Sequence, residues 1–403
     1  MNQPSLQSPR GQLRAAGLIA GFAVTALVAA CGGGDDDEPS KAANQLYTQT
    51  NETANKVVHF VRLSDGTLVR KESTATGGAG VNAVGTTGAT APDSLASQHA
   101  IAINPDGSAL YAVNAGDNTI SVLSIDASSG ALTLKKANAA TAGTRPNSLA
   151  YDKGYLYATF QQGGNQLAAY KVQSDGSLTQ VGAYDLATLG GLTAAAVSPT
   201  QVAASPDGAF IVVNAGTGSN AVMSFGVNAD GTLKAPVTTT ASLATPFAGA
   251  FQPGAAAPTY LATGITGNLL SSFSFSATGA LALLGQAAAT GVAAPCWLVL
   301  TPNGSTAFVG NGSGAISSYA LGAAGAVTLL NSTAASEPSA ISGVTSVAAD
   351  SWISPDGKFL YTAYLGDDKV VAYSIGQGGA LAKLGETVIG TATGLSLQGL
   401  AGL

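Results

Sequence analysis

Two histidines are the only imidazole side chains in this sequence, and they lie in different settings. His99 directly precedes a short β-prone run, residues 100–103, so it is expected at the start of a strand. Because a neutral imidazole can take a proton from an attacking water, His99 is our candidate general base. The alternative is a strand residue that is only hydrogen-bonded. His59 lies in the middle of the run 57–61, where we expect a structural role.

Arg145 and Asp350 are the candidate charged partners, and each stands at the start of another predicted strand. A guanidinium can orient a carboxylate, although Arg145 could equally brace a loop by pairing with Asp93 or Asp350. Asp350 and Trp352 could supply an acid and a stacking platform, or a salt bridge and a core aromatic. Gln201 begins a further strand of this kind and is a candidate ligand-binding amide.

The second cysteine and the loops that contain Asn and Asp are weaker candidates for catalysis or metal binding. No Cys–His spacing surrounds Cys296, so we interpret it as a small buried hydrophobe. Several Asn and Asp residues recur near predicted loops and could offer oxygen ligands to calcium, namely Asn114, Asn214, Asn311, Asp117, Asp367 and Asp368. A repeated Asn near Gly is more simply a turn-former, and no ligand spacing is defined. We therefore predict no metal and no cofactor.

These candidate residues lie within a sequence repeat. The phrase that begins at residue 103 returns at residues 205 and 354, each time with Pro-Asp-Gly followed by β-prone runs and a second Gly turn. Asp-Gly tolerates the positive φ angles of tight hairpins. Four short strands in a period of about 50 residues indicate a β-propeller blade rather than a helical repeat. The sequence therefore predicts an all-β fold.

The number of turns predicts how the propeller closes. Seven copies of the second turn occur but only six of the first, and the N-terminal copy, residues 46–71, lacks its first strand. The stretch 394–400 at the other end has the character of that missing strand. We therefore expect seven four-stranded blades, the first closed by the C-terminal strand, which leaves no open sheet edge.

Blade geometry predicts where a site belongs. With strands A (innermost) to D (outermost), the A–B and C–D turns share one face, and the B–C loops and D–A crossovers share the other. The crossovers vary in length, for example 77–98, 187–201 and 331–350. Because variable loops on a rigid scaffold commonly carry function, the site is expected on the crossover face around the channel.

The N-terminus has the organisation of an export signal. Arg10 and Arg14 precede an uncharged run, residues 15–30, which is short for a membrane span. The run ends Leu-Val-Ala-Ala-Cys, which resembles the lipobox of bacterial lipoproteins, in which the cysteine, here Cys31, is lipidated. We expect a signal peptide over 1–30, an acidic tether over 31–44 and the propeller over 45–403. An uncleaved apolar anchor is the alternative.

The composition limits the classes of partner that this protein is expected to bind. Only 9% of residues are charged and the net charge is −6, so a nucleic-acid partner is not expected. With Cys31 acylated, Cys296 has no intramolecular partner, and the fold must stand without disulfides. We expect a monomer anchored in the membrane through the lipid, without a known protein partner. By resemblance to lipoprotein sorting, Gly32 after the cysteine favours the outer membrane.

The repeat phrases resemble those of the lactonase-type propellers, which include phosphogluconolactonase-like and carboxymuconate-cyclase-like proteins. The phrases are Ser-Pro-Asp-Gly followed by Phe-Leu-Tyr, Asp-Gly with a later Leu, and Pro295-Cys296-Trp297-Leu298 leading into a Pro-Asn-Gly turn. The resemblance implies a seven-bladed propeller over the repeat. It also implies a site of His, Arg and acidic groups at the top of the channel, where His99 matches the family's histidine position.

Two functions are therefore expected as alternatives. The first is hydrolysis of a small lactone at the crossover-face channel, with His99 as base, Arg145 orienting a carboxylate and Asp350 as acid. Gln201 and Trp352 would contact the ligand. The second is a non-catalytic propeller tethered to the cell envelope, which binds a small molecule, a glycan or a protein through the same face.

Overall fold

The computed structural model describes residues 43–403, except residues 141, 193–196, 217, 241 and 243–244. The chain divides into two units, Met1–Glu38 and Pro39–Leu403, and the described structure belongs to the second. Cys31, the expected signal peptide and nearly all of the expected tether lie outside the described residues. Among the helices that are described, none is long and apolar enough to cross a membrane.

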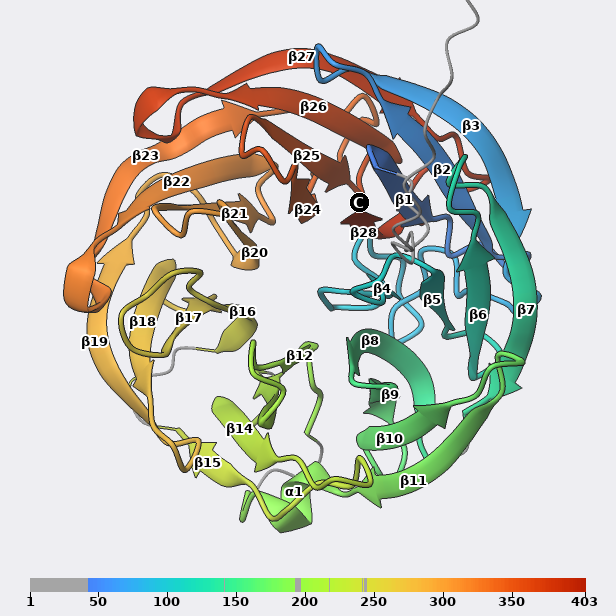
Figure 1. Cartoon of the computed structure of the whole chain (residues 1–403). Helices are drawn as coiled ribbons and strands as arrows, with labels where there is room; N and C mark the ends of the chain where they lie inside the picture. Colours follow the sequence, from blue (N-terminus) through green and yellow to red (C-terminus); the bar gives the residue numbers. More distant parts are fainter. Residues whose placement is uncertain (1–42, 141, 193–196, 217, 241, 243–244) are drawn as a thin grey trace, which may run out of the picture. The chain divides into compact units, whose positions relative to one another are not determined.

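Seven four-stranded antiparallel sheets stand around a central axis in the unit Pro39–Leu403 (Figure 1). In six of them the four strands follow one another along the chain, and each therefore forms one blade. The remaining sheet has the order β28-β1-β2-β3, so its innermost strand comes from the C-terminal end of the chain. The predictions of an all-β, seven-bladed propeller and of its closure are confirmed.

The strands of each blade run from the axis outward. Blade 1 consists of β28 (Gln398–Gly402), β1 (Gln45–Gln49), β2 (Lys56–Arg62) and β3 (Leu68–Ala75), and blade 2 consists of β4 (Ile101–Ile103), β5 (Ala109–Asn114), β6 (Thr119–Ile125) and β7 (Leu132–Ala139). Blade 3 consists of β8 (Thr144–Asp152), β9 (Tyr155–Gln162), β10 (Leu167–Val172) and β11 (Leu178–Tyr184). Blade 4 consists of β12 (Gln201–Ala204), β13 (Phe210–Ala215), β14 (Ala221–Gly226) and β15 (Val237–Thr239). Blade 5 consists of β16 (Pro246–Phe251), β17 (Thr259–Gly264), β18 (Leu269–Phe275) and β19 (Leu281–Ala288). Blade 6 consists of β20 (Pro295–Leu300), β21 (Thr306–Asn311), β22 (Ala315–Leu321) and β23 (Val327–Ser336). Blade 7 consists of β24 (Ala348–Ile353), β25 (Phe359–Tyr364), β26 (Lys369–Ile375) and β27 (Leu381–Val388).

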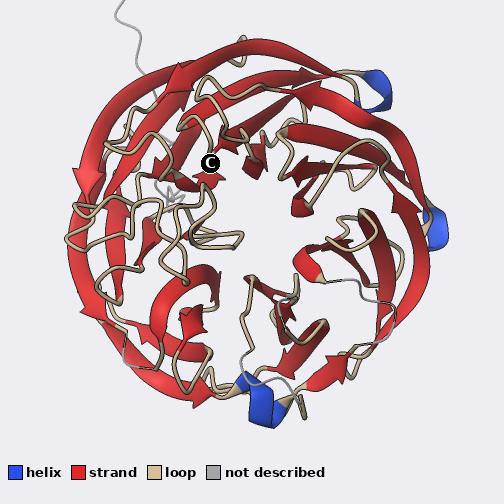
Figure 2. Ribbon diagram, turned by 180° about the vertical axis from the view of Figure 1, so that it is seen from behind, coloured by secondary structure: helices blue, strands red, loops and turns tan. Residues whose placement is uncertain are grey.

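Three short helices lie at the outer rim of the ring (Figure 2). They are α1 (Leu186–Leu189), η1 (Ala323–Gly325) and η2 (Gln377–Gly379). Each connects strands and none covers the channel. Asp185 caps α1 by accepting hydrogen bonds from the N–H groups of Ala187 and Thr188.

The closure of blade 1 joins the two ends of the described chain. Leu46 lies opposite Gly402 in the β1–β28 ladder, and Gln49 lies opposite Gln398. The N–H of Asn44 donates to the carbonyl of Leu403 over 2.9 Å. Because β1 pairs with β28 on one side and with β2 on the other, the closure leaves no unpaired edge on β1.

Burial is greatest in the middle strands of each blade, because neighbouring blades pack on both of their faces. β17 and β25 are buried along their whole length, whereas the outer strand β27 is largely exposed. The Pro-Asp-Gly turns form as expected. In blade 4 the Asp207 carboxylate accepts the N–H of Ala209, and Gly208 follows with a φ of +63°, which glycine adopts without a steric penalty.

Candidate functional site

The crossover from blade 1 to blade 2, residues 77–98, reaches the inner strands of other blades at its C-terminal end, and we call it the plug. At its end, the Gln98 side chain pairs with the backbone of Leu298 in blade 6 as a strand would. Gln98 Nε2 donates to the Leu298 carbonyl and the Leu298 N–H donates to Gln98 Oε1, both over 2.9 Å. Trp297 Nε1 donates to the carbonyl of Ser97 over 2.9 Å. The plug is therefore fixed to the blade opposite its own.

The plug also contacts blades 3, 4 and 1. Gln161 donates to the Leu95 carbonyl, and the Gln98 N–H donates to the carbonyl of Thr200. Gln398 donates to the Pro92 carbonyl. The inner strands are accordingly buried at their starts and become partly exposed toward their ends, as in β12 and β20. The accessible part of the inner strands therefore lies toward the A–B turn face.

Substitution of Gln98 by alanine is expected to destabilise the propeller. Two hydrogen bonds would be lost, and the N–H and C=O of Leu298 would stay buried without partners, which costs about 2–5 kcal/mol in the free energy of unfolding. Urea unfolding of Gln98→Ala beside the exposed control Gln377→Ala measures this. A loss in Gln98→Ala no greater than that in the control would show that the plug is not held by this pair.

His99 stands where the plug meets β4, and it is partly exposed. Its φ of +67° turns the chain toward the strand, and its N–H donates to Asp350 Oδ1 over 2.9 Å. The ring nitrogens lie 3.2 Å from Gln98 Nε2 and 3.3 Å from Gln201 Nε2. Burial lowers the pKa of His99 to about 4, against the opposing hydrogen bond to the Val202 backbone. The imidazole is therefore neutral at pH 7.

Two carboxyl groups share the region beside His99. Burial raises the pKa of Asp350 to about 7, although the N–H groups of His99 and Gly399 donate to it. Burial and the charge of Asp350 raise the pKa of Asp93, on the plug, to about 7 as well. Neither group takes part in any ion pair that the described residues form. Such a pair favours a state with less negative charge, reached by binding a proton or a cation.

Arg145 does not join this group. Its Nε donates to Gln161 Oε1 over 3.0 Å, and its Nη2 donates to the carbonyls of Val84 and Ser94 in the plug over 2.9 and 3.4 Å. The guanidinium thus braces the plug, and no ion pair links it to Asp93 or Asp350 in the described part of the chain. Its role in orienting a substrate carboxylate stays a prediction.

Gln201 and Trp352 both lie on inner strands, and each has a packing role. The Gln201 amide pairs with the backbone of Gly249 in blade 5, donating to its carbonyl over 3.0 Å and accepting its N–H. Trp352 packs on Tyr361 with ring centroids 5.9 Å apart, and it stays partly exposed. Contact of Trp352 with a ligand stays a prediction, whereas Gln201 reaches the site through its amide contact with His99.

The weaker candidates have local partners. Cys296 is buried, and burial raises the pKa of its thiol, so the thiolate needed for nucleophilic attack is disfavoured. Asn114 is hydrogen-bonded to Asn55, Thr119 and Ser121 within blades 1 and 2. Among the residues that the structure describes, no group of three or more His, Cys, Asp or Glu side chains is arranged to hold a metal ion.

Asp93 is the functional candidate that sequence reasoning missed, since it entered only as a partner for Arg145. It lies in a long crossover without a motif, and the fold alone brings it to Asp350. The Asp-Ser-Leu-Ala-Ser-Gln-His run that leads from it to His99 carries no chemical spacing.

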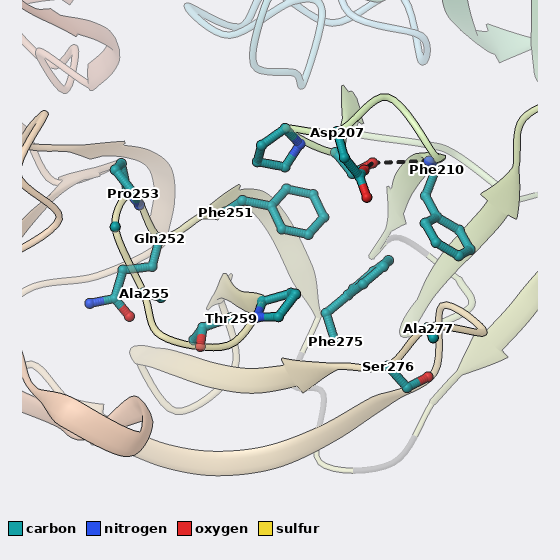
Figure 3. A pocket seen from close by; sticks show the side chains of 14 residues that line it. Asp207, Phe210, Phe251, Gln252, Pro253, Ala255, Thr259, Phe275, Ser276 and Ala277 are labelled. Carbon is teal, nitrogen blue, oxygen red and sulfur yellow. Dashed lines mark hydrogen bonds between the residues drawn. The ribbon is translucent and has the colours of Figure 1, made fainter.

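A hollow of about 580 Å³ lies on the opposite, A–B turn face, between blades 4 and 5 (Figure 3). Phe275 packs edge-to-face against Phe210 and Phe251, with centroids 5.2 and 5.0 Å apart. Asp207 lines the hollow, but its carboxylate caps its own turn. No residue predicted for catalysis lines this hollow.

The ring of seven blades and its polar, plugged axis define the class of protein as a seven-bladed β-propeller. Residues 40–188 match the family described as "Lactonase, 7-bladed beta-propeller". This match confirms the resemblance to lactonase-type propellers that was proposed from the repeat phrases. No curated protein matches this chain in sequence.

Solved structures extend the similarity over the whole propeller. A candidate 6-phosphogluconolactonase from Bacteroides uniformis is 19% identical, with a TM-score of 0.67 over 88% of this chain and 98% of that one. Its counterpart from Bacteroides fragilis is 17% identical, with a TM-score of 0.66 over 90% and 99%. The periplasmic gluconolactonase of Pseudomonas aeruginosa is 20% identical, with a TM-score of 0.63 over 88% and 98%. At these identities the similarity establishes the fold alone.

Proposed function

We propose that this propeller hydrolyses a small lactone at its axis, with His99 as the proton acceptor. The observation that carries the proposal is a partly exposed, neutral imidazole at the axis of a propeller that resembles lactonases. Lactone opening needs a base to activate water and few other catalytic groups, because the carbonyl carbon is already electrophilic.

The reaction can be written with His99 alone as the group that moves a proton. The water oxygen bonds to the lactone carbonyl carbon while His99 takes a proton from that water. The bond between this carbon and the ring oxygen then breaks, and the imidazolium returns the proton to that oxygen, which gives a hydroxy acid. The contacts of 3.2 and 3.3 Å from Gln98 and Gln201 are long, so a water can compete for the ring's acceptor nitrogen. Asp350 holds the backbone of His99, and its predicted role as an acid is not needed.

The charges around the axis favour an uncharged lactone as the substrate. Binding a phosphate needs converging cations. Here Arg145 is engaged by the plug, and the groups beside His99 are the carboxyls of Asp93 and Asp350. A phosphorylated lactone would approach these carboxyls without a compensating cation from the described residues, which disfavours its binding.

The test is hydrolysis of a panel of lactones by the purified chain, comparing gluconolactone with its phosphorylated form. We expect turnover of the uncharged lactone above the buffer rate and little turnover of the phosphorylated one. Faster hydrolysis of the phosphorylated lactone would overturn the substrate class. No turnover of either would favour the alternative, a non-catalytic binding propeller, for which the bonding of the plug to the inner strand of blade 6 is the supporting observation.

We also propose that the chain is exported and anchored to the cell envelope, in the outer membrane, through a lipid on Cys31. The support comes from the basic start, the apolar run and the Leu-Val-Ala-Ala-Cys phrase. The mass of the mature protein should then exceed that of residues 31–403 by its acyl chains, and Cys31→Ser should lose this increment. A mature chain that retains residues 1–30 would support an uncleaved anchor instead.

A further inference from the structure

Buried polar atoms without partners gather where the plug meets blade 1. Gln49 is fully buried, and neither its Oε1 nor its Nε2 has a hydrogen-bond partner. Gln398 Oε1 and Asp93 Oδ1 are likewise buried and unpartnered. Since a buried polar atom without a partner is costly, several in one place point to a bound species.

The register of blade 1 places these atoms together. Gln49 and Gln398 lie opposite each other on β1 and β28, so their side chains leave the sheet on the same face. On that face Gln398 donates to the carbonyl of Pro92, and it also bonds to the carboxyl of Asp93. The three side chains therefore meet at one seam between the closing strand and the plug.

The charge at this seam indicates the sign of the bound species. Asp93 and Asp350 are close enough for the charge of one to affect the other, and no lysine or arginine of the described residues pairs with either. An anion would add to the repulsion, and a water would leave it unchanged. A cation would relieve it and would also coordinate the unpartnered oxygens.

We propose that Asp93 Oδ1, Gln398 Oε1 and Gln49 Oε1 form a calcium site that locks the plug onto the closing strand. Carboxylate and amide oxygens are hard ligands of the kind that calcium prefers. With one carboxylate among the ligands and Asp350 as a nearby charge, the affinity should be modest, with a dissociation constant of roughly 10⁻⁴–10⁻³ M. This inference goes beyond the proposed lactonase and does not depend on it.

The test compares the thermal unfolding midpoint of the purified full chain in chelator, in calcium and in magnesium. At ten times the dissociation constant, calcium should raise the midpoint by about 2 °C, because only the folded state holds the site. Magnesium should have a smaller effect, because it demands a stricter geometry. An equal midpoint in chelator and in calcium would overturn the proposal, and would show that water suffices at the seam.

The variant Asp93→Asn should abolish the calcium effect without unfolding the chain. In chelator its midpoint should equal or exceed that of the parent, because a buried repulsion with Asp350 is removed. Asp207→Asn, on the far face, is the matched control and should keep the whole rise. The acidic run 35–38 is present in both variants, so a rise that persists in Asp93→Asn would place calcium on that run and overturn the site.

Terbium gives a readout that is independent of stability. Trp297 is bonded to Ser97, whose N–H in turn donates to Asp93, so a terbium ion at the seam lies close enough for the indole to sensitise its emission. The emission should be displaced by calcium and absent in Asp93→Asn. Emission of equal strength in that variant would contradict the proposal.

Discussion

Removal of residues 395–403 is expected to cost about 5 kcal/mol or more in the free energy of unfolding, which is comparable to the whole stability of many domains. Leu397 and Leu400 are buried in the core between blades 1 and 7. Their loss exposes that core and leaves β1 as an unpaired edge beside the axis. Asp350 also loses the N–H of Gly399. Urea unfolding and the tendency to aggregate measure the effect.

A circularly permuted chain is the matched control for this truncation. Because the Asn44 N–H bonds to the Leu403 carbonyl, a short glycine linker can join Leu403 to Asn44, with new ends between Gly390 and Thr391. This chain keeps β28 in its register and should retain most of the parent stability. A truncated chain as stable as the permuted one would show that closure contributes little.

The substitution His99→Asn is expected to lower kcat/KM for the preferred uncharged lactone by about 100-fold or more, as the loss of a general base does. Asparagine tolerates the positive φ at this position, so the backbone and its N–H to Asp350 are retained. The neutral base form predominates above its pKa of about 4, so the parent rate should be level near neutral pH and fall as the pH drops below about 4.

His59→Asn is the control for this activity measurement, since His59 is the other imidazole of the chain. It lies on β2, bonded to Glu72 and Gln45 and remote from the axis, and its loss should leave kcat/KM nearly unchanged. Equal rates for His99→Asn and the parent would remove His99 from the mechanism. Equal losses in both variants would indicate a general effect on folding.

The propeller itself was predictable from the sequence, because local turn chemistry carries the information. Pro-Asp-Gly and the second Gly turn repeat at each blade, and such turns form from a few adjacent residues. The surplus of one second turn even predicted closure by the C-terminal strand. The run 100–103 was likewise predicted as a strand, and β4 (Ile101–Ile103) lies there.

The arrangement of the site depended on the tertiary structure. Sequence reasoning placed His99, Arg145 and Asp350 at strand starts, which is where they lie, but could not tell which of them meet. The structure brings Asp350 to the backbone of His99 and directs Arg145 to the plug. Two of the partners of Arg145, the Val84 and Ser94 carbonyls, are backbone groups that any sequence could offer.

The sequence by itself determined the number of blades, their closure and the position of His99 at the axis, because these follow from short-range turns and from counting. Only the tertiary structure decided that the end of the plug bonds to blade 6, that Asp93 reaches Asp350 and that Gln49 stands beside Gln398. The physical reason is that each of these contacts joins segments far apart in the chain. Packing of the whole ring, rather than any local preference, brings such segments together.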